Sequence, residues 1–334
     1  MTNNVASDGP PKGLVVNIQH FCTEDGPGLR CTVFLKFCSL RCKWCSNPET
    51  IGRLPELAYN MNKCIGAKAC GRCLHPPAPE GAMYVVDGLD DRIHVNWDLA
   101  SECGEETASV CPTGALYLFG REMTVDEVLN EVEQDQASFA DSGGGITVSG
   151  GECMLSPDFT AALLEEAHNR GINTAVETAS NVPYANIEKV APHVDYYYHD
   201  IKSMDAERHK KWSGASNKRV LDNLKRLYEQ FPDKKFIART PVIPGVNDSE
   251  ENIRATLDFI RPHPNVIKYE LLPYHRFGQS KYGFLGQKYE LEDFPSLPEE
   301  TIVRLRTIVD EAFGRKGWSE VNDPLQPPGS ATTG

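Results

Sequence analysis

The placement of the cysteines constrains this chain of 334 residues more than any other feature. The sequence contains 11 cysteines, and all but Cys153 lie between Cys22 and Cys111. The first residues, Met1 to Gly13, are polar and lack the apolar region of a secretory signal. Disulfides are rare outside oxidising compartments, where cysteines more often bind metals or take part in catalysis. The concentration of sulfur in the first third of the chain therefore predicts metal binding or catalysis there.

The net charge limits the partners of the chain. With 34 Lys and Arg against 47 Asp and Glu, the formal charge is −13. Sequence-independent binding to nucleic acid, or to an anionic membrane surface, needs a basic face. The sequence also contains no apolar run of about 18 residues, the length that spans a bilayer. We therefore expect neither nucleic acid nor a membrane as a partner.

Strand-like and helix-like segments alternate along most of the chain. Thr124, followed by Glu127, forms a capping-box pattern before one helical stretch. Such alternation predicts parallel strands connected by helices. Six strands give an α/β fold, a partial (β/α)6 TIM-like barrel, with ligands at the carboxyl ends of the strands. The expected strands are Cys31–Phe37, Ile146–Ser149, Ile172–Glu177, Val194–Ile201, Lys235–Ile243 and Val266–Leu272. The expected helices are Thr124–Ala137, Pro157–Arg170, Tyr184–Val190, Lys218–Gln230, Ser249–Arg261 and Pro298–Phe313.

One segment interrupts this alternation. Residues 47–120 are rich in Cys, Gly and Pro and show little periodicity. We interpret them as a cysteine-rich insertion into a barrel made of residues 13–46 and 121–317. The polar ends of the chain, residues 1–12 and 321–334, are expected to be loose.

The loop after the first expected strand carries the strongest chemical signal. Cys38, Cys42 and Cys45 place three thiols within eight residues. Thiolates are the preferred ligands of iron–sulfur clusters, and three of them leave one iron of a cubane open for a substrate. A structural zinc site with a remote fourth ligand is the alternative.

These residues resemble a known family. The spacing Cys-x3-Cys-x2-Cys, with Trp44 before the last cysteine, is similar to the motif of radical S-adenosylmethionine (SAM) enzymes. Upstream, the segment DGPGLR resembles the DGPGxR motif of glycyl-radical-enzyme activating enzymes, a subgroup of that superfamily. The resemblance implies that this segment supports the cluster or docks a partner. Its matching residues are Asp25, Gly26, Pro27, Gly28 and Arg30.

The resemblance also implies a reaction. A [4Fe–4S] cluster held by the three cysteines would chelate SAM and reductively cleave it to a 5′-deoxyadenosyl radical. That radical would abstract a hydrogen atom from a backbone glycine of a partner glycyl radical enzyme. The cofactors supply this chemistry, and the protein supplies orientation and exclusion of water.

Further motifs match the family in the same order along the chain. The resemblance gives catalytic positions to Lys202 and His275. It gives SAM-binding positions to Trp44, Gly150, Gly151, Glu152, Glu177, Thr178, Asp200 and Arg239. An ordinary structural role remains the alternative for each of these residues. For Asp200 and Lys202 the alternative is a surface salt bridge, because the two side chains share a face of the strand.

Three cysteines lie outside both the Cys38–Cys45 loop and the insertion. Cys153 stands where the family usually has proline, and we interpret it as a partly buried, inert thiol. Cys22 and Cys31 flank the DGPGLR segment without a cluster spacing. We interpret these two as buried thiols as well.

The insertion contains a second set of cysteines. Its spacing resembles the ferredoxin-like iron–sulfur domain of many such activating enzymes, in which a Cys-Pro cysteine completes a distant run of three. We therefore expect one auxiliary [4Fe–4S] cluster and not two, with a zinc site as the alternative. Cys103 is left without a cluster. The expected ligands are Cys64, Cys70, Cys73 and Cys111.

The expected partners follow from the implied reaction. They are a glycyl radical enzyme and a low-potential reductant of the flavodoxin or ferredoxin type, in an anaerobic cytoplasm. A radical SAM enzyme acting directly on a small molecule is one alternative. An iron–sulfur electron carrier is another, but it would close its clusters with four cysteines, which the trio at residues 38–45 lacks.

Overall fold

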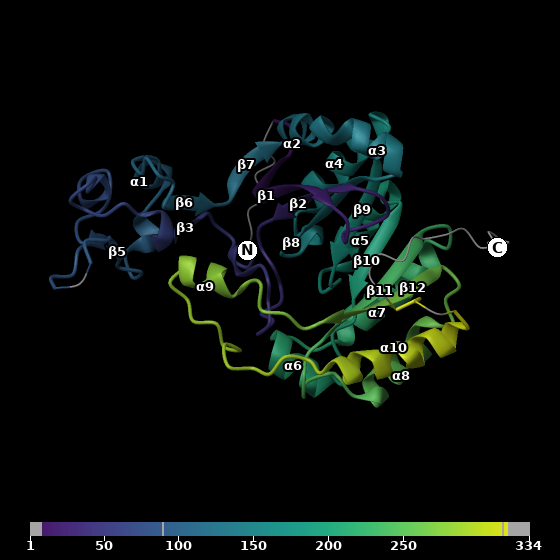
Figure 1. Cartoon of the computed structure of the whole chain (residues 1–334). Coiled ribbons are helices and arrows are strands. Elements are labelled where there is room, and N and C mark those ends of the chain that lie inside the picture. The colour runs from purple at the N-terminus through teal and green to yellow at the C-terminus, as the bar shows by residue number, and fades with distance from the viewer. Residues whose placement is uncertain (1–8, 89, 316, 320–334) are drawn as a thin grey trace.

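An eight-stranded sheet forms the centre of the computed structural model, which describes residues 9–88, 90–315 and 317–319 (Figure 1). Its strand order is β12-β11-β10-β9-β8-β2-β1-β7. The six strands from β2 to β12 in this order are parallel, and β1 and β7 extend the sheet antiparallel at one side. The strands are β1 (Lys12–Cys22), β2 (Arg30–Leu35), β7 (Arg121–Thr124), β8 (Gly145–Gly150), β9 (Asn173–Thr178), β10 (Tyr196–Asp200), β11 (Lys235–Val242) and β12 (Val266–Pro273).

The six parallel strands confirm the predicted partial barrel. Each expected strand is present within a few residues of its predicted bounds. The antiparallel strands β1 and β7 were not predicted. Lys12 pairs with Thr124, so it belongs to the sheet and not to a loose N-terminal segment. Residues 1–8 and 321–334, also expected to be loose, lie outside the described residues.

Helices connect and cover the parallel strands. The capping box at Thr124 is present, because the Glu127 amide donates to the Thr124 hydroxyl at 3.2 Å. The helix expected over Thr124–Ala137 divides into α2, a 3-10 turn η5 (Glu133–Asp135) and α3. The helices are α2 (Val125–Val132), α3 (Gln136–Ser142), α4 (Pro157–Asn169), α5 (Tyr184–Val190), α6 (Ala206–Ser213), α7 (Lys218–Gln230), α8 (Glu250–Ile260), α9 (Gln279–Phe284) and α10 (Glu299–Phe313).

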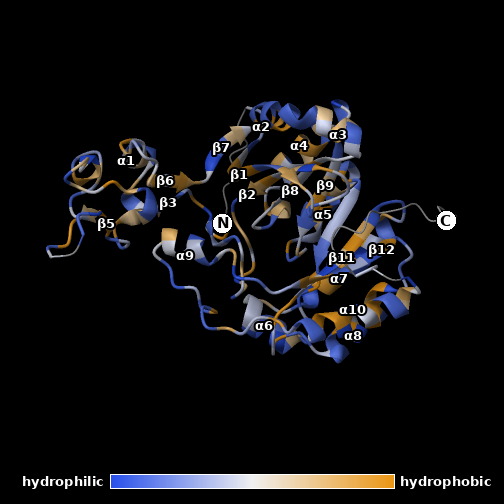
Figure 2. Ribbon diagram, in the orientation of Figure 1, coloured by the Kyte–Doolittle hydropathy of each residue, from blue (hydrophilic) through white to orange (hydrophobic). Residues whose placement is uncertain are grey.

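The two faces of the sheet differ in polarity, because successive side chains of a strand point to opposite sides. In β8, Ile146 and Val148 belong to the main apolar core, whereas Ser149 lines a cavity on the inner side. Figure 2 shows the apolar colouring concentrated on the strands and the polar colouring on the outer parts of the helices. The inner side of the partial barrel is therefore available for polar chemistry.

The cysteine-rich segment forms small sheets of its own to one side of the barrel (Figure 1). Leu57, Met83 and Leu116 belong to an apolar cluster separate from the main core. The ferredoxin-like character of this segment stays a prediction. Its elements are β3 (Glu56–Tyr59) paired with β6 (Leu116–Phe119), β4 (Met83–Tyr84) paired with β5 (His94–Val95), and α1 (Glu105–Ser109).

Within the described residues, no helix combines the length and the apolar character needed to cross a bilayer.

Candidate active site

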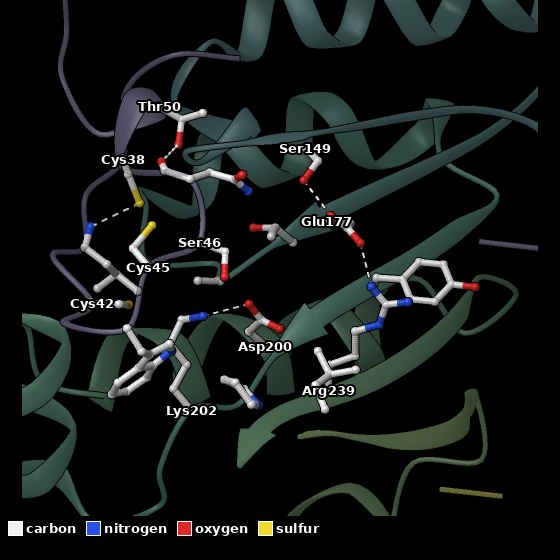
Figure 3. Close-up of a pocket in the computed structure, with 18 of the residues that line it drawn as sticks. Cys38, Cys42, Cys45, Ser46, Thr50, Ser149, Glu177, Asp200, Lys202 and Arg239 are labelled. Atoms are coloured by element: carbon white, nitrogen blue, oxygen red, sulfur yellow. Dashed lines mark hydrogen bonds and ion pairs between the residues drawn. The ribbon is translucent and has the colours of Figure 1, made fainter. Parts of the chain in front are cut away.

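A cavity of about 660 Å³ opens at the carboxyl ends of the parallel strands. This volume lies in the range of pockets for small ligands. Figure 3 shows the cysteine loop on one side and polar side chains from the strand ends on the other. The sequence-predicted residues that line the cavity are Asp25, Cys38, Cys42, Trp44, Cys45, Gly150, Gly151, Glu177, Thr178, Asp200, Lys202, Arg239 and His275.

The glycine pair holds the start of the cysteine loop. A Cβ atom on Gly150 would lie 2.3 Å from the Leu35 backbone, and Gly150 has a φ of +108°, so only glycine fits. The Gly151 amide donates to the Leu35 carbonyl at 2.9 Å, and the Glu152 amide donates to the Phe37 carbonyl at 2.9 Å. The loop after β8 is thereby fixed against the residues that lead into Cys38.

The three thiols of this loop are partly buried and line the cavity. Burial raises the pKa of Cys38 to about 12 and that of Cys45 to about 12, and it also raises the pKa of Cys42. Buried thiolates therefore need a positive centre to stabilise them. An iron–sulfur cluster would supply such a centre, and a zinc ion is the alternative.

Asp200 and Lys202 form an ion pair inside the cavity. The Lys202 Nζ lies 2.7 Å from Asp200 Oδ2, and the Lys202 side chain is 11% exposed. Burial alone would lower the pKa of Lys202, but Asp200 and Cys42 raise it above its ordinary value. Lys202 is therefore a permanent cation facing both Asp200 and the cysteine loop (Figure 3). The predicted salt bridge between Asp200 and Lys202 is therefore present, and both residues also line the cavity.

Arg239 is held by contacts on several sides. Its guanidinium donates to Glu177 at 2.5 Å, to Glu270 at 2.7 Å and to the Glu24 carbonyl. It also stacks over the Tyr198 ring at 4.1 Å. These contacts fix the guanidinium at the inner wall of the cavity.

The carboxyl group of Glu177 points into the cavity between Arg239 and Ser149 (Figure 3). The Ser149 hydroxyl donates to Glu177 Oε2 at 2.5 Å. Burial and the neighbouring Asp25 raise the pKa of Glu177, and Arg239 opposes that rise. The ion pair with Arg239 thus stabilises a carboxylate that its surroundings would otherwise protonate.

Sequence reasoning missed the residues behind Arg239. Glu270 is buried, and it accepts from Arg239 and, at 3.0 Å, from the Lys268 ammonium. Lys268 and Glu270 alternate with apolar residues on β12 and therefore share the inner face. Two charged residues, Lys268 and Glu270, placed two positions apart in an otherwise apolar strand, are the sequence signal that could have indicated buried charges there.

The DGPGLR segment forms the floor of the barrel. Arg30 is completely buried and donates to Thr147 at 3.0 Å and to Asn173 at 2.7 Å. Asp25 accepts from Thr32 at 2.7 Å and lines the cavity. Gly26, Pro27 and Gly28 form the turn between them, and a Cβ on Gly28 would lie 2.5 Å from the backbone of Gly144. This placement favours the supporting role of the segment, because Arg30 has no exposed surface with which to dock a partner.

Glu152 lies beside the cavity without lining it. Its carboxylate accepts from the Thr178 hydroxyl at 2.6 Å and from the Ala179 amide at 3.0 Å. In this structure it fixes the end of β9, so Thr178 reaches the cavity in a defined position.

Trp44 and His275 occupy different depths of the site. Trp44 belongs to the cysteine loop, where it lines the cavity and is buried with Ile243 and Tyr282. His275 is exposed at the rim, where its ring stacks on Phe277 with a centroid distance of 4.5 Å. Phe277 is 84% exposed, so the rim presents an aromatic surface to solvent.

Three cysteines outside the two cysteine sets, and one buried histidine, do not line the cavity. Cys153 was expected to be partly buried, but it is completely buried and donates to the Glu177 carbonyl at 3.4 Å. Cys22 and Cys31 are also buried. His199 lies on the outer face of β10 against Tyr228, away from the cavity.

The second set of cysteines separates into a group and an outlier. Burial raises the pKa of Cys73 to about 11, with smaller effects from the neighbouring thiols of Cys111, Cys64 and Cys70. Cys103 has no such thiol neighbours, and its sulfur donates instead to the Leu99 carbonyl at 3.8 Å. The ligand set of Cys64, Cys70, Cys73 and Cys111 stays a prediction.

Comparison with known proteins identifies the family. Residues 109–260 match the model of the radical SAM superfamily. The chain is 47% identical over 281 residues to an isethionate sulfite-lyase activating enzyme of Desulfovibrio desulfuricans, covering 84% of this chain and 89% of that protein. This chain belongs to the glycyl-radical-enzyme activating enzymes. A [4Fe–4S] cluster and SAM are the cofactors of this radical SAM family.

Two other relatives act on different partners. A (2S)-3-sulfopropanediol sulfolyase activating enzyme of Bilophila wadsworthia is 45% identical, covering 85% of this chain and 92% of that protein. A choline trimethylamine-lyase activating enzyme of Oleidesulfovibrio alaskensis is 35% identical, covering 89% of this chain and 95% of that protein. All three names describe activation of another enzyme, which matches the expected partner.

Proposed function

We propose that this chain activates a glycyl radical enzyme that cleaves a carbon–sulfur bond in a small organosulfonate. The observation that carries the proposal is the higher identity to activating enzymes of a sulfite-lyase and a sulfolyase, 47% and 45%, than to that of a trimethylamine-lyase, 35%. A radical SAM enzyme acting directly on a small molecule is not favoured, because these relatives are all activating enzymes.

The proposed site divides the work between the cysteine loop and the strand ends. Cys38, Cys42 and Cys45 would hold the cluster, which together with SAM supplies one-electron chemistry and a carbon radical when bound. Asp200 and Lys202 lie across the cavity from the loop and offer one acceptor and one cation. These charges suit the amino, carboxylate and ribose groups of SAM.

The inner wall would set the position of the ligand. Arg239 and Glu177 are held in place by their ion pair, so neither has to reorganise when the ligand binds. Gly150 and Gly151 allow close approach of the backbone at the end of β8. Glu152 acts as a positioning residue through its hydrogen bond to Thr178.

The rim is the proposed entry for the glycine loop of the partner. His275 and Phe277 form the exposed aromatic stack at the cavity mouth. A loop with a glycine at its tip has no side chain to clash with the narrow site, and an aromatic surface can bury its backbone. Excluding water there protects a radical from side reactions.

One auxiliary [4Fe–4S] cluster is proposed in the insertion, on Cys64, Cys70, Cys73 and Cys111. The test is the iron content of reconstituted protein, with Cys103→Ser as the matched control. We expect about eight irons per chain in wild type and in Cys103→Ser, and about four in Cys111→Ser. Equal iron loss in the two variants would contradict this ligand set.

The proposed reductant is an acidic protein of the flavodoxin or ferredoxin type. Arg41 and Lys43 lie on the outer side of the cysteine loop, and their amides donate to the carbonyls of Ser213 and Trp212 at the end of α6. Lys43 and Lys211 each place an ammonium 5.7 Å from the Trp212 ring. Lys43 also pairs with Glu290 at 2.7 Å, and the group of Arg41, Lys43 and Lys211 would steer an acidic partner toward the cluster. An anaerobic cytoplasm is the proposed location.

The test of partner choice uses two glycyl radical enzymes in parallel. Reduced, reconstituted protein and SAM are incubated with an isethionate sulfite-lyase or with a choline trimethylamine-lyase, and the glycyl radical is quantified by electron paramagnetic resonance. We expect the radical in the sulfite-lyase at a rate at least tenfold above that in the trimethylamine-lyase. Equal rates, or a preference for the trimethylamine-lyase, would overturn the proposed partner class.

A further inference from the structure

Three residues of different types meet beside the hairpin of β1 and β2, away from the active-site cavity. His20 lies near the end of β1, Cys31 near the start of β2, and Asp135 at the end of η5. The His20 Nδ1 lies 2.7 Å from Asp135 Oδ2 and 3.9 Å from the Cys31 sulfur. The ligand atoms of the three residues all lie within 4.8 Å of one another, and no other group of three among the described residues does so.

We propose that His20, Cys31 and Asp135 bind one zinc ion. Nitrogen, sulfur and carboxylate oxygen are the three donor types that zinc takes from proteins. A tetrahedral ion with bonds of about 2.0–2.3 Å holds its ligand atoms roughly 3.3–3.8 Å apart, so the three atoms need only small shifts. Zinc is favoured over magnesium or calcium because those cations select oxygen ligands.

Burial of the group supports a site that is closed on one side. Cys31 is completely buried and Asp135 is 6% exposed, whereas the His20 side chain is 30% exposed. We expect a water molecule from the exposed side to be the fourth ligand. The arrangement therefore has three protein ligands and one open position.

The position of the site suggests what bound zinc would do. His20 and Cys31 stand just before and just after the loop of residues 23–29, which forms the floor of the active-site cavity. Asp135 belongs to the turn between α2 and α3. One ion would therefore link the two strands of the hairpin to the helical layer and stiffen the floor.

The test uses reconstituted protein, in which iron already occupies the cluster cysteines. Zinc sulfate is added anaerobically, the protein is desalted, and zinc and iron per chain are measured by mass spectrometry. Cys31→Ser and Asp135→Asn remove one ligand each. Cys22→Ser is the matched control, because Cys22 is a buried cysteine of the same hairpin that lies outside the group.

We expect one zinc per chain, with iron unchanged, in wild type and in Cys22→Ser. Both ligand variants should bind zinc at least tenfold more weakly. X-ray absorption at the zinc edge should show one sulfur at about 2.3 Å and nitrogen or oxygen for the rest. Should Cys31→Ser fold poorly by circular dichroism, Asp135→Asn decides, since it keeps the shape of the side chain.

Several results would overturn the proposal. They are no zinc above background in wild type, equal zinc in wild type and Asp135→Asn, a zinc edge with more than one sulfur, or zinc taken up only as iron is lost. In any of these cases the group is a His20–Asp135 hydrogen bond beside an inert thiol. The active-site proposal does not depend on either result, because none of the three residues lines the cavity.

Discussion

Replacing Glu270 with Gln would remove the negative charge that lies between two buried cations. The Glu270 carboxylate is 2.7 Å from Arg239 Nε and 3.0 Å from Lys268 Nζ, and its side chain is only 5% exposed. Removing one partner of a buried ion pair costs about 3–5 kcal/mol, because the remaining charge stays desolvated. Gln keeps the shape and one acceptor, so we expect a loss near the lower end, about 3 kcal/mol.

Glu250→Gln is the matched control for Glu270→Gln. Glu250 also contacts two cations, Arg254 at 3.5 Å and Arg304 at 3.3 Å, but its side chain is 45% exposed. Exposed pairs contribute about 0–1 kcal/mol. The free energy of unfolding of each variant is measured by urea denaturation followed by circular dichroism.

The expected difference between the two variants is about 2 kcal/mol or more, which is over tenfold in the unfolding equilibrium constant. Glu270→Gln should also weaken SAM binding, because Arg239 loses one of its anchors at the cavity wall. Unfolding free energies within about 0.5 kcal/mol of each other in the two variants would refute the reasoning that the buried network is coupled and desolvated.

Two further predictions concern pH and backbone conformation. Burial lowers the pKa of His199 to about 3, and its ring contacts the Tyr228 hydroxyl. Since the unfolded chain takes up this proton near pH 6.5, stability is lost as pH falls below that value, by about 2 kcal/mol between pH 7 and pH 5. In His199→Asn this part of the pH dependence of the unfolding free energy should disappear, and an unchanged pH dependence would count against it. Gly150→Ala should destabilise the protein by about 2–4 kcal/mol, because a Cβ meets the Leu35 backbone and the φ is positive. Gly171→Ala, with a positive φ but open space, should cost only about 1 kcal/mol, and equal denaturation midpoints would exclude the steric argument.

The parallel part of the fold was predictable because its strands are apolar on the buried face and alternate with amphipathic helices. Helices α5 and α7 have the predicted bounds, Tyr184–Val190 and Lys218–Gln230. Strand β1 was missed because exposed and buried residues mix along it, and β7 because it has only four residues. Helix α6 was missed because only His209 and Ser213 of its residues are buried, which leaves no apolar stripe.

The candidate site was predictable where the type and spacing of the residues indicate their chemical role. The spacing of Cys38, Cys42 and Cys45 and the pattern of Asp200 and Lys202 predicted residues of one site, and all five line the cavity. The spacing of Lys268 and Glu270 indicates charges on the inner face of β12, but it does not identify Arg239 on the neighbouring strand as their partner, so the link from Arg239 to Glu270 was not predictable. The burial of Arg30 under the barrel likewise depends on contacts with residues more than a hundred positions away, such as Thr147.

The most direct test of the central claim is SAM cleavage by the protein alone. Anaerobically reconstituted protein is reduced with dithionite and mixed with SAM, and 5′-deoxyadenosine is quantified by chromatography. Cys42→Ala removes one proposed cluster ligand, and Cys103→Ala is the control that removes a cysteine outside both proposed clusters. We predict 5′-deoxyadenosine in wild type and in Cys103→Ala and none in Cys42→Ala. No nucleoside from fully reconstituted wild type, or equal amounts from all three proteins, would contradict the assignment of SAM cleavage to the loop of Cys38, Cys42 and Cys45.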